Sequence, residues 1–232
     1  MAVPPPLYWL VMPAAGSGER MGGGPPKQYR PLAGRTVIEH ALAPFLADRR
    51  CVGLVVALAA NDLSFARLGF GAEPRLRTVT GGATRAASVA AGLAAVAAAV
   101  GDQDPWVLVH DAARPCLAAD DLETLLEALP NSPAGALLGF PLADTVKRAD
   151  AGGRVTATVP RVGLWRAATP QAFRLRRLQA ALAVAEAPTD ESSAVEALGD
   201  APQLIPCSPC NLKLTTAGDF DSAAWYLLGE QR

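Results

Sequence analysis

Residues 8–21 read YWLVMPAAGSGERM, an apolar run that passes directly into small residues and glycines. The uninterrupted apolar run from Tyr8 to Ala14 predicts a strand that is buried on both faces of a parallel sheet. In an open parallel sheet, ligands bind at the carboxyl ends of the strands. We therefore expect the glycine- and proline-rich segment from Ala15 to about Pro31 to be a loop that contacts a ligand.

The composition of this loop favours a phosphate ligand. The small residues Ala14, Ala15 and Gly16 let the backbone approach a ligand closely, and exposed N–H groups in such a loop can bind phosphate oxygens. Arg20 and Lys27 would add fixed positive charge beside that backbone. The alternative is an ordinary surface loop, because clusters of glycine and proline usually have no further role.

Two familiar phosphate-binding motifs are excluded by single residues. A Walker A loop requires Ser or Thr after its lysine, and here Gln28 follows Lys27. A dinucleotide fingerprint requires a third glycine where Met21 stands, and a helix that begins at once. The loop therefore indicates a different class of nucleotide site.

Strands and helices alternate outward from this loop. The predicted strands are 8–14, 51–57, 76–80, 106–110, 135–140 and a short one near residue 204. The predicted helices are 36–47, 62–68, 84–100, 120–129, 173–185 and 217–228. Such alternation predicts an α/β fold with a mostly parallel, doubly wound sheet.

One stretch interrupts this alternation. Residues 144–159 alternate polar and small β-branched side chains around Gly152-Gly153, which predicts an exposed β-hairpin. We therefore expect a single domain over residues 1–232, with a protruding hairpin arm at about residues 142–163.

Composition limits the kinds of partner that the protein can have. Half of the 232 residues are hydrophobic, enough for a substantial core, and the net charge of −1 does not favour binding to nucleic acid or an anionic membrane. The longest apolar stretch, Ala86 to Val100, is shorter than the roughly 20 residues of a membrane span. The proline-rich start does not resemble a signal peptide, and the four cysteines form no secreted pattern. We expect a cytoplasmic protein that meets an anionic substrate with a few well-placed cations.

A carboxylate and a cysteine pair require separate interpretation. Asp111 follows the predicted strand 106–110, at the ligand edge of the sheet, and Mg²⁺ is typically held by one or two carboxylates plus phosphates. We predict that Asp111 is a magnesium ligand; the alternative is an aspartate that caps the following turn. Cys207 and Cys210 form one CxxC pair without a second pair or a histidine cluster, so we predict neither a zinc site nor a redox role.

Four segments together resemble a known family. They are the loop from Pro13 to Lys27, GGATRAASV at 81–89, VLVHDAARP at 107–115 and NLK at 211–213. In this order they resemble the 2-C-methyl-D-erythritol 4-phosphate cytidylyltransferase family over nearly the whole chain, and HDAARP is the most specific of the four. The resemblance implies a Rossmann-like three-layer α/β/α nucleotidyltransferase fold. It also implies transfer of CMP from CTP to methylerythritol phosphate, with release of pyrophosphate, in the non-mevalonate isoprenoid pathway.

The chemistry of such a reaction fits the residue types in the chain. A substrate phosphate oxygen would attack the α-phosphorus of CTP, and it needs no strong base because the second pKa of a phosphate monoester is about 6. Catalysis is then mostly positioning and electrostatic stabilisation. This agrees with a chain that has only two histidines, His40 and His110, and no evident pair of nucleophile and base.

The resemblance assigns a role to individual residues. Alanine at position 83, where relatives often have a polar or acidic residue, leaves only backbone for a contact with cytosine, and Arg114 either binds substrate phosphate or holds its loop. The family is a homodimer whose arm crosses to the other subunit. The implied catalytic residues are Arg20, Lys27 and Lys213; the nucleotide-binding residues are Ala14, Ala15, Gly16, Gly82, Ala83 and Ser88; the substrate-binding residues are Arg114, Thr145, Arg161, Thr169 and Thr189; and Asp111 would bind Mg²⁺.

Two alternative functions stay open at this point. The chain could be another nucleotidyltransferase of the same fold, acting on ribitol 5-phosphate or a sugar phosphate, although Arg161 and the arm favour methylerythritol phosphate. It could also be a nucleotide-binding relative without catalytic activity, against which Arg20, Lys27, Asp111 and Lys213 argue.

Overall fold

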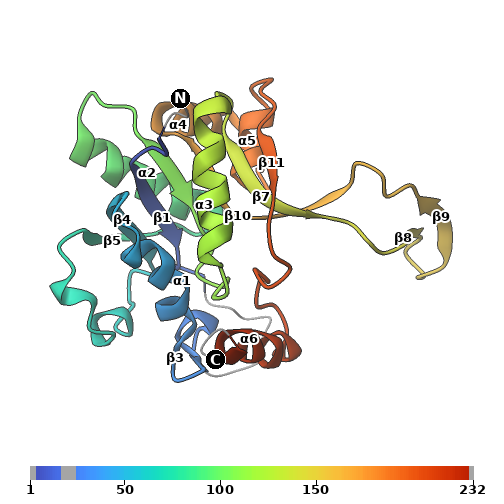
Figure 1. The fold of residues 1–232 in the computed structure, drawn as a ribbon, viewed down its shortest axis with the longest axis horizontal. Coiled ribbons are helices and arrows are strands. Elements are labelled where there is room, and N and C mark those ends of the chain that lie inside the picture. Colours follow the sequence, from blue (N-terminus) through green and yellow to red (C-terminus); the bar gives the residue numbers. More distant parts are fainter. Residues whose placement is uncertain (1–3, 17–24, 230–232) are drawn as a thin grey trace.

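The computed structural model describes residues 4–16 and 25–229. Its centre is a seven-stranded sheet with the strand order β11-β7-β10-β6-β1-β4-β5 (Figure 1). Only β10 runs against its neighbours in this sheet; it pairs antiparallel with both β6 and β7, and the other neighbouring pairs are parallel. The strands are β1 (Tyr8–Pro13), β4 (Cys51–Leu58), β5 (Leu76–Thr80), β6 (Trp106–Val109), β7 (Ala136–Pro141), β10 (Trp165–Arg174) and β11 (Gln203–Pro206).

Helices cover both faces of the sheet, and the central strand β1 shows how. Leu10 and Met12 belong to a core cluster with residues of α1 and α3, whereas Val11, between them, belongs to a second cluster with residues of α2, α4 and α5. Side chains alternate between the faces of a strand, so the two clusters lie on opposite faces and the three-layer prediction is confirmed. The helices are α1 (Val37–Ala47), α2 (Arg85–Val100), α3 (Ala119–Ala128), α4 (Leu175–Val184), α5 (Glu191–Glu196) and α6 (Ala217–Gly229).

The helix starts expected near residues 36 and 84 are confirmed, and local capping explains both. The Glu39 carboxylate accepts a hydrogen bond from the Thr36 backbone N–H at 2.7 Å, directly before α1. Thr84 precedes α2, and its hydroxyl oxygen accepts from the Ala87 N–H at 3.1 Å. Such contacts satisfy backbone donors that have no partner within a helix. They fix where α2 begins, beside the loop 81–83.

In the second half of the chain, one expected helix starts later than predicted and two elements were missed. The predicted helix 173–185 begins only at Leu175, because Phe173 and Arg174 are the last residues of β10. β10 itself was not predicted. Its sequence has a run of alanines and Pro170 but no apolar alternation, and its strand geometry comes from pairing with β6 and β7. The short helix α5 was also missed.

The segment 62–68, expected as a helix, forms only the 3₁₀ turn η3 (Phe65–Arg67). Further short elements are η2 (Lys27–Tyr29), η4 (Phe70–Ala72), η5 (Leu129–Asn131) and the paired two-residue strands β2 (Pro31–Leu32) and β3 (Arg35–Thr36). No helix within the described ranges combines the length and the apolar composition needed to cross a membrane.

A two-stranded hairpin stands away from the body of the molecule (Figure 1). Its strands β8 (Val146–Ala149) and β9 (Val155–Val159) pair antiparallel, and their side chains are mostly exposed. At the turn, Gly153 has a φ of +78°, and the Asp150 carboxylate accepts from the N–H groups of Gly152 and Arg154 at 2.9 Å. Glycine suits this turn because it adopts positive φ without strain.

Candidate active site

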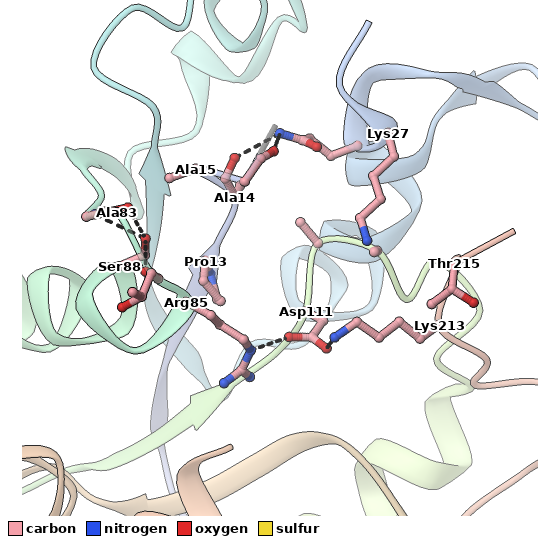
Figure 2. A pocket seen from close by; sticks show the side chains of 16 residues that line it. Pro13, Ala14, Ala15, Lys27, Ala83, Arg85, Ser88, Asp111, Lys213 and Thr215 are labelled. Atoms are coloured by element: carbon pink, nitrogen blue, oxygen red, sulfur yellow. Dashed lines mark hydrogen bonds and ion pairs between the residues drawn. The ribbon is translucent and has the colours of Figure 1, made fainter. Parts of the chain in front are cut away.

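A cavity of about 620 Å³ lies at the carboxyl ends of β1, β5 and β6 (Figure 2). This is the edge at which open parallel sheets bind ligands. The cavity brings together four segments that are far apart in the sequence. Its lining consists of Pro13, Ala14, Ala15, Gly16, Lys27, Gln28, Gly82, Ala83, Thr84, Arg85, Ser88, Asp111, Ala112, Ala113, Lys213 and Thr215.

The backbone after β1 is held from two sides. The buried Gln28 donates its side-chain N–H groups to the carbonyl oxygens of Ala14 at 2.8 Å and Gly16 at 3.3 Å. On the other side, a Cβ added to Gly81 would lie 2.7 Å from the Cβ of Ala15, so only glycine permits this close approach. The two glycine-containing loops therefore meet, and backbone from both lines the cavity.

The start of α2 forms one wall of the cavity. Ser88 is buried, and its hydroxyl oxygen accepts from the Gly82 N–H at 3.1 Å and donates to the Thr84 carbonyl at 3.0 Å. The hydroxyl predicted to contact the nucleotide thus closes the loop before the helix. Ala83 is exposed at the same wall. The first turn of a long helix presents unpaired N–H groups and a partial positive charge, which favour an anionic ligand.

Cationic side chains reach the cavity from separate elements (Figure 2). Lys213 Nζ lies 2.8 Å from Asp111 Oδ2, and Arg85 Nε donates to Asp111 Oδ1, also at 2.8 Å. Lys27, on η2, donates its Nζ to the Leu214 carbonyl at 3.3 Å. The structure thus brings Lys27, Asp111 and Lys213 to one site. Arg20, the other predicted catalytic residue, lies outside the described residues.

Asp111 is ionised despite its burial. Burial opposes the charged form, but the Arg85 guanidinium and the Lys213 ammonium outweigh it and hold the pKa of Asp111 well below its usual range. The described residues contain no group of three or more His, Cys, Asp or Glu side chains that could hold a metal ion unaided. A single carboxylate fits Mg²⁺, which takes its other ligands from phosphates and water.

The comparisons with known proteins decide the family. The family model of 2-C-methyl-D-erythritol 4-phosphate cytidylyltransferase matches residues 8–229. The chain belongs to this family. It is 48% identical over 231 residues to the protein of that name from Ectopseudomonas mendocina, covering 97% of this chain and 98% of the relative, and 49% identical over 220 residues to the one from Pseudomonas fluorescens strain Pf0-1, covering 93% and 94%.

Solved structures of similar proteins agree with this membership. A crystal structure of 4-diphosphocytidyl-2C-methyl-D-erythritol synthase superimposes with a TM-score of 0.83 at 38% identity, covering 95% of this chain and 98% of the other. The 2-C-methyl-D-erythritol 4-phosphate cytidylyltransferase of Francisella tularensis gives a TM-score of 0.77 at 33% identity, covering 94% and 99%. The nucleotidyltransferase fold inferred from the four motifs is therefore confirmed.

Two residues predicted to bind substrate in this family member lie behind the cavity wall. Arg114 is buried, and its guanidinium donates to the carbonyl oxygens of Asn211 at 2.7 Å and Ala167 at 3.4 Å. Of its two predicted roles, the observed contacts fit the one that holds its loop. Thr169 Oγ1 accepts from the Asp111 N–H at 3.1 Å and lies 3.0 Å from His110 Nδ1. In this chain both residues position the segment that carries Asp111.

Three other predicted substrate residues lie away from the cavity lining. Thr145 and Arg161 are exposed at the base of the hairpin, where the Arg161 guanidinium donates to the Ala143 carbonyl. Thr189 is exposed just before α5, and its N–H donates to Ser193 Oγ at 3.0 Å. Their role in substrate binding stays a prediction.

Sequence reasoning missed two charged residues of this site. Arg85 lines the cavity and pairs with Asp111 and with Glu191, which is fully buried. Arg85 is part of the GGATRAASV segment, so its position at the first turn of α2 was a usable signal. Glu191 lies 106 residues further along the chain, and no local pattern links it to Arg85. Only the packing of α5 against the sheet brings it there.

Proposed function

We propose that this chain transfers the cytidylyl group of CTP to 2-C-methyl-D-erythritol 4-phosphate, giving CDP-methylerythritol and pyrophosphate, in non-mevalonate isoprenoid biosynthesis. One observation carries the proposal most directly. In a member of this family, Lys27, Asp111 and Lys213 line the same cavity as the backbone of residues 14–16 and 82–84.

The main barrier in this reaction is the repulsion between a dianionic phosphate and a triphosphate. Lys27 and Lys213 enter the cavity from η2 and from the segment before α6, so a triphosphate between them would meet positive charge on two sides. The start of α2 would add backbone N–H groups. Preorganised charge of this kind stabilises the phosphorus-centred transition state without a general base. Arg20, which follows β1 in the sequence, would add a further cation.

Magnesium is the metal we propose for this site. When bound, it would neutralise charge on the phosphate oxygens, as divalent ions do in phosphoryl and nucleotidyl transfer. Asp111 would hold it, since its carboxylate is ionised and lines the cavity. We expect EDTA to abolish pyrophosphate release and added Mg²⁺ to restore it.

We further propose a homodimer in which the arm completes the site of the partner subunit. The hairpin stands away from its own body, and Thr145 and Arg161 at its base do not line the cavity of their own chain (Figure 1). An arginine that approached from a second subunit could bind the phosphate of methylerythritol phosphate with its planar guanidinium. Thr189 would support that subsite, and Thr169 would act through the segment that carries Asp111. A cytoplasmic location is part of the same proposal.

A pyrophosphate-release assay tests the proposed function. CTP, Mg²⁺ and methylerythritol phosphate are each omitted in turn, and we expect release only when all three are present. Ribitol 5-phosphate and a sugar phosphate replace the acceptor in parallel reactions. Faster turnover with either of them would assign the chain to another nucleotidyltransferase activity. CTP binding without any release of pyrophosphate would indicate a non-catalytic relative.

A further inference from the structure

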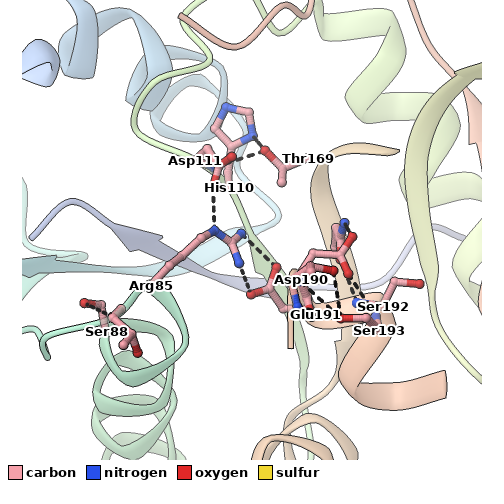
Figure 3. A network of polar contacts seen from close by, with 12 residues as sticks. Arg85, Ser88, His110, Asp111, Thr169, Asp190, Glu191, Ser192 and Ser193 are labelled. Atoms are coloured by element: carbon pink, nitrogen blue, oxygen red, sulfur yellow. Dashed lines mark hydrogen bonds and ion pairs between the residues drawn. The ribbon is translucent and has the colours of Figure 1, made fainter. Parts of the chain in front are cut away.

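A partly buried ion pair lies next to Asp111 (Figure 3). The two terminal nitrogens of Arg85 bond to the two carboxylate oxygens of Glu191 at 2.6 and 2.9 Å, while its Nε donates to Asp111 Oδ1 at 2.8 Å. We propose that Arg85 and Glu191 are positioning residues, which fix one oxygen of Asp111 so that the other oxygen is available to a divalent cation. This inference rests on the proposed function, because it concerns the cation that accompanies CTP.

The first observation in support is how Arg85 distributes its N–H groups between Glu191 and Asp111. A guanidinium can bind one carboxylate with two parallel N–H groups, and here Glu191 receives that bidentate contact. Asp111 receives only the remaining Nε. Because Glu191 neutralises Arg85, the negative charge of Asp111 is less fully compensated by Arg85 and can attract another cation. Without Glu191, the two terminal nitrogens could turn to Asp111 and occupy both of its oxygens.

The second support is that Glu191 is fixed by the strand that also fixes Asp111. Gln171 on β10 donates to Asp190 Oδ2 at 2.9 Å and accepts from the Ser192 N–H at 2.8 Å, so it holds both neighbours of Glu191. Two residues earlier, Thr169 accepts from the Asp111 N–H. β10 therefore sets the distance between the two carboxylates that share Arg85.

The two oxygens of Asp111 differ in how firmly their partners are held. Oδ1 faces Arg85, which is anchored by a carboxylate with no exposed surface. Oδ2 faces Lys213, whose Nζ is 2.8 Å away and whose side chain is 39% exposed, and the buried Arg114 Nε is more distant from Oδ2, at 3.7 Å. A cation that arrived with the nucleotide would therefore replace Lys213 at Oδ2, and the ammonium would move to the phosphates. Arg85 would keep its place.

Metal binding tests this inference without relying on turnover. Mn²⁺ is titrated into the protein with CTP and no acceptor, and its binding is followed by electron paramagnetic resonance. For Glu191→Gln we expect Mn²⁺ affinity to fall by about 10–100-fold, the usual cost of losing a group that orients a metal ligand. Glu191→Asp, which keeps the charge on a shorter side chain, should lose less. Affinity equal to wild type in the folded Glu191→Gln protein would overturn the proposal.

A double-mutant cycle separates positioning from general stability. If Glu191 acts through Asp111, adding Glu191→Gln to Asp111→Asn should reduce the rate no further. Fully multiplicative losses would overturn the proposal. If Glu191→Gln does not fold, the same cycle with Glu191→Asp decides by the same criterion.

A control is a second pair in which both terminal nitrogens of an arginine bind one carboxylate, between Arg50 and the more exposed Glu123. It lies outside the cavity lining, so Glu123→Gln should leave Mn²⁺ affinity unchanged, and an equal loss there would also overturn the proposal. The proposed function and this inference fail differently. A wild-type protein that releases no pyrophosphate contradicts the function, whereas an active wild type with an unaffected Glu191→Gln variant contradicts only the positioning role.

Discussion

Single residues set the charge of the cavity. Arg85, Arg114 and Lys213 surround Asp111 within 3.7 Å, and Glu191 balances one of them. The cluster carries excess positive charge before any ligand arrives, with Lys27 close by on the same cavity. Repulsion between these cations costs free energy when no anion is bound, and a bound triphosphate would offset it. The residue-level geometry thus favours an anionic ligand.

Removing either lysine should slow the chemical step. We expect Lys27→Ala and Lys213→Ala each to reduce kcat by at least about 10²-fold, the usual cost of losing one contact to the transition state. Pyrophosphate release under saturating substrates measures the effect, and thermal melting confirms the fold. Arg177→Ala, which removes an exposed cation on α4, is the control. Turnover near the wild-type rate in both lysine variants would refute the electrostatic role.

His110 should make the free energy of unfolding decrease at acidic pH. Its Nε2 lies 3.0 Å from the Arg114 carbonyl, which can only accept, so Nε2 carries the proton and Nδ1 faces the Thr169 hydroxyl. Burial lowers the pKa of His110 from 6.5 to about 4. The unfolded chain therefore takes up a proton at a higher pH than the folded protein, and acidification favours unfolding.

The corresponding loss of stability from His110 is about 2 kcal/mol between pH 7 and pH 5. Urea unfolding at both values measures it. In His110→Gln, whose side chain does not titrate, this part of the pH dependence should disappear. Identical pH dependence in the variant and the wild type would exclude His110 as its source.

At the scale of elements, close packing of α2 on β1 positions the cavity wall. A Cβ on Gly92 would lie 2.5 Å from Val11 Cγ1, so the helix approaches the strand more closely than any residue with a side chain would allow. The same helix begins at the cavity with Thr84 and Arg85. The depth at which α2 packs therefore decides where its N-terminal N–H groups point.

Gly92→Ala tests this packing. Alanine is a better helix former by about 1 kcal/mol, but overpacking a core costs about 1–3 kcal/mol. We expect the overpacking to dominate and the free energy of unfolding to fall by up to about 2 kcal/mol, as measured by urea titration. Ala90→Gly, an exposed position on the same helix, isolates the helix-propensity effect. A more stable Gly92→Ala protein would show that the interface between α2 and β1 can accommodate a methyl group without strain.

At the scale of the whole molecule, the body and the hairpin differ in how far their side chains are buried. The body contains the core clusters, whereas most side chains of β8 and β9 are exposed and contact little of it (Figure 1). Exposed apolar residues such as Val155 and Val162 lie on the hairpin or beside it. The hairpin therefore contributes little to the stability of its own chain, which agrees with the proposal that it contacts a second subunit.

Replacing residues 146–159 by a short glycine-serine turn should separate these roles. We expect the shortened protein to melt within a few degrees of the wild type and to bind CTP normally, because neither the core nor the cavity lining includes the hairpin. It should elute as a monomer and lose turnover with methylerythritol phosphate. Light scattering measures the oligomeric state, and the pyrophosphate assay measures turnover. A monomeric wild type, or a shortened dimer with full turnover, would contradict the role of the arm.

Local patterns were sufficient for much of the fold. The apolar composition of residues 8–14 was enough to predict β1, and the capping residues Thr36 and Thr84 fix the starts of α1 and α2 through contacts with near neighbours in sequence. The identity of the cavity residues Lys27, Asp111 and Lys213 was also accessible, because each belongs to a motif at a predicted loop or strand end.

Other features depended on contacts between distant parts of the chain. β10 is a strand because β6 and β7 offer it hydrogen-bond partners on both sides, although its own residues show no strand pattern. Glu191 contacts Arg85 because Gln171 anchors the start of α5. By itself the sequence determined the short-range structure and the chemistry that each motif can supply. Only the tertiary structure decided which charges meet, because a burial cost is compensated only by a partner brought within bonding distance from elsewhere in the chain.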